Sequence, residues 1–215
     1  MDPMSPRPYS MEKRQAARNE TRLRILEAAR RLLANESKTD LSMDAIARGA
    51  DVSRLTIYYQ FRSRAGLLEA LFDHLAERGR MHRMAEVFHE SDPSAALEKM
   101  VRTFVGFWAS DSVALRRLRA MSALDPEIAR GIRSRDARRP HIAREILKRA
   151  AGKTKPTTAA MRIAADVLGM LTSFESYDAL ASAGQTEEEI GSTLTRLAHC
   201  ATGQLLGATS RRAPS

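Results

Sequence analysis

One short segment constrains the fold of this chain more than any other, because it fits two incompatible structures. Residues 55–61, LTIYYQF, are mostly β-branched or aromatic, and such residues favour a β-strand. As a strand, the segment would turn every second residue, from Leu55 to Phe61, toward one side. As a helix, it would bury Ile57 and Phe61, which are four residues apart and therefore share a face. The flanking sequence decides between these two structures.

The flanking residues favour a short helix within a helix-turn-helix motif. Ser53 and Ser63 can each cap the start of a helix. The motif needs a small residue where its two helices cross, a tight turn, and an apolar residue that locks the second helix onto the first. Ala47, Asp51 and Ile57 have the side chains and the spacing for these three places. Asp51 stands where the turn requires a positive φ, which aspartate tolerates better than most residues.

In the helical interpretation, the outer face of the second helix suits a DNA groove. Arg54 and Gln60 can donate hydrogen bonds to base edges, and Leu55 can pack on a thymine methyl group. Hydroxyl groups on the same face can bind phosphates. A further phosphate is favoured by the backbone N–H groups at Ser63 and by the charge of Arg64. The predicted DNA-binding residues are Ser42, Ser53, Arg54, Leu55, Thr56, Tyr58, Tyr59, Gln60, Ser63 and Arg64.

Two adjacent exposed tyrosines on one short helix are unfavourable in water unless something covers them. We therefore expect Tyr58 to turn inward against the first helix of the motif. The alternative to DNA binding is that residues 42–64 form a small helical subdomain with no such role.

Most of the remaining chain has the three- and four-residue apolar spacing of amphipathic helices. The expected fold class is therefore all-α. Pro140 should kink or split one helix, and Thr186 and Glu189 form a capping box at the start of the last one. The expected helices cover residues 19–35, with Asn19 or Thr21 as the cap, and then 42–49, 53–62, 63–90, 95–109, 112–123, 126–151, 156–181 and the stretch after Thr186.

Residues 41–71, LSMDAIARGADVSRLTIYYQFRSRAGLLEAL, resemble the DNA-binding domain of the TetR family of bacterial repressors. Arg64 replaces the usual lysine of that family, and Leu55 stands where glycine or proline is common. The features that carry the resemblance are Ile46-Ala47, Val52-Ser53, Thr56 to Phe61, Ser63-Arg64 and Leu67-Leu68.

This resemblance implies a nine-helix protein whose C-terminal domain binds a small-molecule effector and dimerises through its last two helices. The homodimer would place two recognition helices about 34 Å apart on a near-palindromic double-stranded DNA operator. Effector binding would favour a spacing that no longer fits the operator, so the resemblance implies a repressor. An activator with the same DNA-binding domain is an alternative that the sequence leaves open. The expected parts are a flexible arm at 1–10, a helix-turn-helix DNA-binding domain at 11–75, an effector-binding and dimerisation domain at 76–208, and a flexible tail at 209–215.

Several aromatic residues of the C-terminal part are candidates for an effector pocket, because such pockets are mostly apolar with a few polar groups. Each of them can equally be part of an ordinary core. The candidates are Phe104, Phe107, Trp108, His141, Phe174 and Tyr177.

Positive charge is concentrated in the same part of the chain. Residues 112–153 contain twelve Lys and Arg against four Asp and Glu. The arginine-rich segment 130–149 fits three interpretations: a solvated helix face, a second nucleic-acid surface, or a site that neutralises an acidic effector.

The composition argues against other classes of protein. Cys200 is the only cysteine, so no internal disulfide can form, which suits a reducing compartment. No stretch has the roughly 20 apolar residues that span a bilayer, so we expect a cytoplasmic protein with no membrane partner. We expect no catalytic residues, metal or cofactor, because no matching motif is present. The alternative function is a ligand carrier or enzyme on the same helical scaffold, without operator binding.

Overall fold

The computed structural model describes residues 8–35, 41–152 and 156–207, and these residues contain no β-strand. The expected all-α class is therefore confirmed, although the described residues form more than the nine helices expected. The helices are α1 (Pro8–Ala34), α2 (Met43–Ala50), α3 (Arg54–Phe61), α4 (Arg64–Arg78), the 3-10 turn η1 (Met81–Arg83), α5 (Met84–His89), α6 (Pro93–Ser110), α7 (Ser112–Met121), α8 (Pro126–Asp136), α9 (Arg138–Ala151), α10 (Thr158–Leu171), α11 (Phe174–Ser182) and α12 (Glu187–Gly207).

Helix α1 is longer than predicted, because it begins at Pro8 and runs without a break through the predicted caps. Thr21 does not cap the helix; its hydroxyl donates to the Ala17 carbonyl at 2.9 Å. The side chains that hold α1 to the protein come from its second half, where Ile25 and Leu33 are buried. Of the predicted flexible arm, residues 1–7 lie outside the described residues, as does the predicted tail at 209–215.

Side-chain caps begin several helices, as the sequence predicts. Ser42, Ser53 and Ser63 each accept a hydrogen bond from the backbone N–H three residues on, and so begin α2, α3 and α4. The capping box of α12 is also present. The Thr186 N–H donates to Glu189 Oε2 at 2.8 Å, and the Glu189 N–H donates to Thr186 Oγ1 at 3.3 Å.

The long helix expected at 63–90 is wrong, because α4 ends at Arg78. Arg80 takes a positive φ of 57°, and η1 and α5 follow as separate elements. The break lies where the chain passes close to α6, because a Cβ on Gly79 would lie 2.4 Å from a ring carbon of Phe107. Only glycine lets the end of α4 approach that ring so closely.

The long helix expected at 156–181 is also divided, at Thr172 and Ser173. The Thr172 hydroxyl donates to the Leu168 carbonyl at 2.8 Å, and the Thr172 carbonyl accepts a hydrogen bond from Trp108 Nε1 at 3.0 Å. Ser173 then caps α11. The predicted break in the arginine-rich helix is confirmed: α8 ends at Asp136, and Pro140 lies in the first turn of α9, where proline is tolerated.

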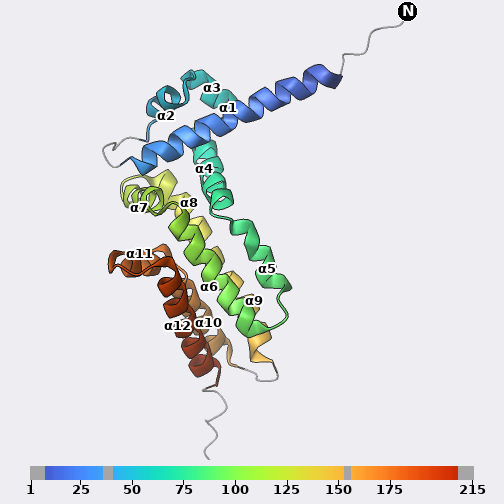
Figure 1. The fold of residues 1–215 in the computed structure, drawn as a ribbon, viewed down its shortest axis with the longest axis vertical. Helices are drawn as coiled ribbons and strands as arrows, with labels where there is room; N and C mark the ends of the chain where they lie inside the picture. Colours follow the sequence, from blue (N-terminus) through green and yellow to red (C-terminus); the bar gives the residue numbers. More distant parts are fainter. Residues whose placement is uncertain (1–7, 36–40, 153–155, 208–215) are drawn as a thin grey trace, which may run out of the picture.

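Figure 1 shows α1 to α3 at one end of an elongated molecule, with α4 leading from them into a bundle of the remaining helices. α4 packs on α6 and α8, and α1 packs on α7. The contact between α4 and α8 is tight, because a Cβ on Gly131 would lie 2.3 Å from the Phe72 ring. None of the described helices is both long and apolar enough to cross a bilayer.

Candidate nucleic-acid interface and effector cavity

The turn between α2 and α3 has the geometry that the spacing predicts. Asp51 adopts the left-handed conformation, with φ 52° and ψ 53°. The Val52 N–H donates to the Ala47 carbonyl at 3.1 Å, which fixes the angle between the helices. Ala47 is buried where the two helices meet. The sequence therefore assigns the turn correctly, with aspartate in the place where glycine is easiest.

Helix α3 buries one face and exposes the other, so the β-strand interpretation of residues 55–61 is wrong. Ile57 is 0% exposed and Phe61 is buried beside it, whereas Leu55 is 58% and Tyr59 is 73% exposed. The end of α3 meets the start of α4 closely: a Cβ on Gly66 would lie 2.2 Å from the Phe61 carbonyl oxygen. The inner face of α3 therefore fixes its outer face in place.

The polar side chains on the outer face of α3 make few and weak hydrogen bonds within the protein. Arg54 donates to Asp44 at 3.3 Å and to the Tyr58 hydroxyl at 3.4 Å, and all three side chains are exposed. Thr56 and Ser53 share a hydrogen bond of 2.8 Å between their hydroxyl groups. Exposed pairs of this kind contribute little to stability, so a competing partner can displace them at small cost.

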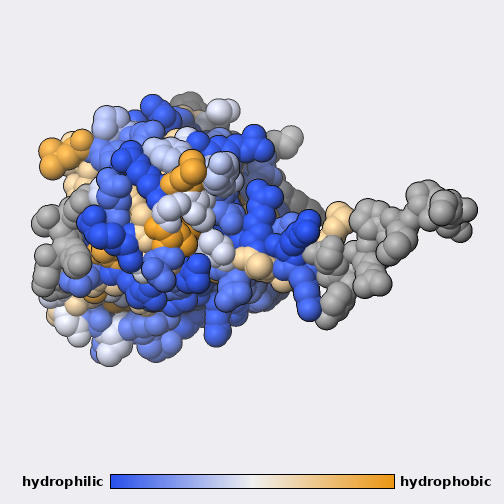
Figure 2. Space-filling model, turned by 90° about the horizontal axis from the view of Figure 1, so that it is seen from above, coloured by the Kyte–Doolittle hydropathy of each residue, from blue (hydrophilic) through white to orange (hydrophobic). Residues whose placement is uncertain are grey.

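Tyr58 turns inward less than expected. It is 37% exposed, about half as much as Tyr59, and it leans toward Arg54 rather than into the core. Seen from above in Figure 2, the end of the molecule that carries α1 to α3 is mostly hydrophilic, with a few isolated hydrophobic residues.

Two further predicted DNA-binding residues, Gln60 and Arg64, bind to neighbouring helices of the protein. The Gln60 side-chain amide donates to the Arg18 carbonyl of α1 at 3.2 Å. The guanidinium of Arg64 forms ion pairs with Asp125 and Glu127 at the start of α8. In this conformation, both residues hold α3 and α4 against neighbouring helices, and a DNA contact by either would have to compete with these partners.

Sequence reasoning missed one residue that positions α3. Arg22 of α1 lies over the Phe61 ring, with its guanidinium carbon 4.3 Å from the ring centroid, and donates to the Gln60 carbonyl at 3.1 Å. No local pattern predicts this contact, because the two segments are 38 residues apart in sequence.

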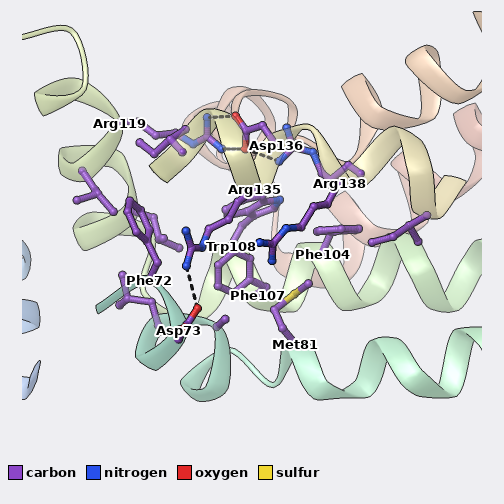
Figure 3. Close-up of a pocket in the computed structure, with 17 residues that line it drawn as sticks. Phe72, Asp73, Met81, Phe104, Phe107, Trp108, Arg119, Arg135, Asp136 and Arg138 are labelled. Atoms are coloured by element: carbon purple, nitrogen blue, oxygen red, sulfur yellow. Dashed lines mark hydrogen bonds and ion pairs between the residues drawn. The ribbon is translucent and has the colours of Figure 1, made fainter. Parts of the chain in front are cut away.

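The C-terminal bundle contains a cavity of about 210 Å³ between α4, α6, α7, α8 and α9 (Figure 3). Three of the predicted ligand-binding residues line it: Phe104, Phe107 and Trp108. The other lining residues are Phe72, Asp73, Leu75, Ala76, Met81, Leu115, Leu118, Arg119, Ile132, Arg135, Asp136, Arg138, Arg139 and Ile142.

The other three predicted ligand-binding residues do not line this cavity. His141 is exposed on α9, although its neighbour Ile142 faces the cavity. Phe174 packs edge-on against Trp108, with 5.5 Å between ring centroids, and Tyr177 packs behind Phe174. Phe174 and Tyr177 are therefore core residues that support the wall of the cavity, because α11 lies behind Trp108 and not beside the cavity.

Arginines supply the charge of the cavity wall, and three of them are held by carboxylates. Arg119 and Arg139 both bind Asp136, at 2.9 and 2.6 Å. Arg135 binds Asp73 of α4 at 2.8 Å and also Glu69. Burial acts to raise the pKa of Asp136, but the hydrogen bonds and charges of the two arginines outweigh it and lower the pKa below its usual value.

No group of three or more His, Cys, Asp or Glu side chains in the described part of the chain is arranged to hold a metal ion.

Comparisons with known proteins identify relatives of the N-terminal part of the chain. Residues 25–71 match the family model described as bacterial regulatory proteins, tetR family. Over 109 residues, which are half of each chain, this chain is 29% identical to the HTH-type transcriptional regulator EthR of Mycobacterium tuberculosis. Over 83 residues, it is 35% identical to the HTH-type transcriptional regulator TtgR of Pseudomonas putida, with 38% of this chain and 40% of TtgR covered. The chain thus spans half the length, or less, of the curated relatives it matches.

Solved structures share the fold over most of the chain. A TetR transcription regulator from Haloarcula marismortui matches with a TM-score of 0.66 and 19% identity, covering 86% of this chain and 97% of that one. NalD of Pseudomonas aeruginosa, described as the secondary repressor of the MexAB-OprM multidrug efflux pump, matches with a TM-score of 0.59 and 20% identity, covering 84% and 96%. The family model and the motif geometry show that residues 25–71 form a DNA-binding domain of the tetR family of bacterial regulatory proteins, and the solved structures show that most of the chain shares the fold of such regulators.

Proposed function

We propose that this protein is a sequence-specific transcriptional regulator, a repressor that a small-molecule effector releases from a near-palindromic operator. The observation that carries the proposal is the outer face of α3. Ile57 and Phe61 hold the inner face of this short helix in the core. Arg54, Leu55 and Tyr59 are exposed on its outer face. A helix presented in this way fits the major groove, where arginine reads guanine and apolar groups contact thymine.

The effector part of the proposal rests on the cavity and on its position. Its wall includes Phe72 and Asp73 of α4, the helix that directly follows α3. A molecule bound in the cavity would touch the element that sets the orientation of the recognition helix. In a homodimer, a small rotation of α4 in each protomer would change the spacing of the two α3 helices, which should be about 34 Å for successive major-groove faces. A cytoplasmic location and the absence of enzymatic activity belong to the same proposal.

The test is DNA binding by the full chain, measured by fluorescence anisotropy with labelled DNA that flanks its own gene. Binding should weaken steeply as salt rises, because phosphate contacts release counterions. Arg54→Ala should weaken binding by about 1–3 kcal/mol and relax the sequence preference at one position. Tyr59→Ala should also weaken it.

Arg133→Ala is the matched control for Arg54→Ala. Arg133 is also exposed, but it lies on α8 and not on α3. Unchanged binding by both Arg54→Ala and Tyr59→Ala would contradict the proposal. A ligand carrier or enzyme on the same scaffold predicts no salt-dependent DNA binding at all, so the same experiment separates the two functions.

A further inference from the structure

One arginine of the cavity wall differs from the others. Arg119, Arg135 and Arg139 are held by carboxylates. Arg138 also lines the cavity, but no hydrogen bond or ion pair joins its side chain to any other residue within the described ranges 8–35, 41–152 and 156–207. Figure 3 shows its side chain reaching from the start of α9 toward Phe107 and Trp108. Arg138 is itself exposed to water, so it lines the cavity where the cavity meets solvent, and the protein leaves its guanidinium donors unused.

The acidic groups of the cavity wall are already neutralised. Asp136 is shared by two arginines, and Asp73 binds Arg135. Glu69 and Glu175 reach Arg135 and Arg119 from outside the cavity, and both are more than half exposed to water. A cationic ligand would have to break one of these pairs, whereas an anion would find a free partner in Arg138.

The rest of the wall is apolar and largely aromatic. The rings of Phe72, Phe104, Phe107 and Trp108 enclose the space next to the guanidinium, together with Met81 and Ile142. A ligand that matches this wall has an apolar chain or ring with one charged oxygen group at its end. A guanidinium binds a carboxylate in two parallel hydrogen bonds, which also fixes the orientation of the ligand.

We propose that the effector of this protein is a small organic monocarboxylate with an apolar body, and that Arg138 binds its carboxylate. This inference rests on the proposed function in one respect only, which is that the cavity is the effector site. It goes further in naming the chemical class of the effector and the residue that selects it.

The chain provides its own probe for this site, because Trp108 is its only tryptophan and lies in the cavity wall. Binding is measured as the change in Trp108 fluorescence, without DNA and at about pH 7, where the carboxylate is ionised. Two matched pairs of compounds differ only in the charged group. They are octanoate against octan-1-ol and 3-phenylpropanoate against 3-phenylpropan-1-ol.

For at least one pair, the anion should bind about 10- to 100-fold more tightly than its alcohol, as expected for a charge-assisted hydrogen bond. Arg138→Gln should remove that preference and leave the affinity for the alcohol unchanged. Arg133→Gln, which removes a positive charge from an exposed arginine outside the cavity, should keep the preference.

Equal binding of acid and alcohol in both pairs would overturn the proposal, as would failure of both anions to bind. A preference that persists in Arg138→Gln would overturn the assignment to this residue. Because no DNA is present, a wrong effector class and a failure of operator binding give separate results.

Discussion

Arg64, the first residue of α4, forms an ion pair with Asp125, the N-cap residue of α8. It also binds Glu127 in the first turn of α8. Arg64 follows α3 almost directly, so these contacts join the end of the motif to the helix that carries the cavity arginine Arg135. Arg64 is thus a structural link between the two parts of the chain in this conformation, and its predicted phosphate contact stays a prediction.

We expect Arg64 and Asp125 to be energetically coupled. In a double-mutant cycle of Arg64→Gln and Asp125→Asn, the coupling free energy from urea unfolding should be about 0.5–1.5 kcal/mol. Asparagine is the right replacement, because it keeps the N-cap of α8 while it removes the charge. If the losses of unfolding free energy in the two single variants add up to the loss in the double variant, the ion pair does not link the helices in solution.

The buried face of α3 should contribute far more stability than its exposed face. Ile57→Ala should lower the free energy of unfolding by about 2–4 kcal/mol, because it leaves a cavity under the recognition helix. Leu55→Ala, on the same helix but 58% exposed, should change it by less than about 0.5 kcal/mol. Urea unfolding followed by far-ultraviolet circular dichroism measures both. Similar losses for the two variants would mean that α3 does not pack by the face seen here.

The features that could be predicted from sequence depend on neighbours within about ten residues. The positive φ of Asp51, the shared face of Ile57 and Phe61, and the caps at Ser53 and Ser63 all arise from local spacing. The break after α4 does not, because it lies where Gly79 meets the ring of Phe107, a residue far away in sequence.

The lining of the cavity was predicted only in part, for the same physical reason. Phe104, Phe107 and Trp108 all lie on α6, which the sequence predicts correctly as a helix, and all three line the cavity. Whether Phe174 lines the cavity or supports it depends on how α11 packs, and this is decided by the division at Thr172. The arginine-rich segment left three interpretations open, and the sequence could not show that Arg135, Arg139 and Arg149 bind acceptors elsewhere in the protein.

The Asp136 cluster should make stability depend on pH in acid. The pKa of Asp136 is lowered in the folded protein, so its stabilising contribution is complete above the unfolded value of about 3.8. That contribution is lost as the pH falls through the lower folded pKa. Asp136→Asn should lower the free energy of unfolding by about 2 kcal/mol or more at neutral pH, because it leaves Arg119 and Arg139 without their shared carboxylate.

The difference in unfolding free energy between wild type and Asp136→Asn should therefore shrink as the pH falls from about 5 to about 2. Glu145→Gln is the control, since Glu145 pairs with the exposed Lys148 and with no other residue in the described part of the chain, and it should show little difference at any pH. A constant difference for Asp136→Asn would mean that the charge of this carboxylate does not stabilise the fold.

The exposed apolar side chains of α10 and α12 should form the contact between two protomers. Ile163 and Met170 are seven residues apart, so they lie on one side of α10, and Leu197 stands exposed on α12, which packs beside it. Leu197→Arg should convert the homodimer to monomers in sedimentation-velocity experiments, because it places a charge in an apolar contact. Leu124→Arg, at a residue 91% exposed between α7 and α8, should leave the dimer intact. A wild-type protein that sediments as a monomer at micromolar concentration would contradict the homodimer, and a Leu197→Arg variant that stays dimeric would place the contact elsewhere.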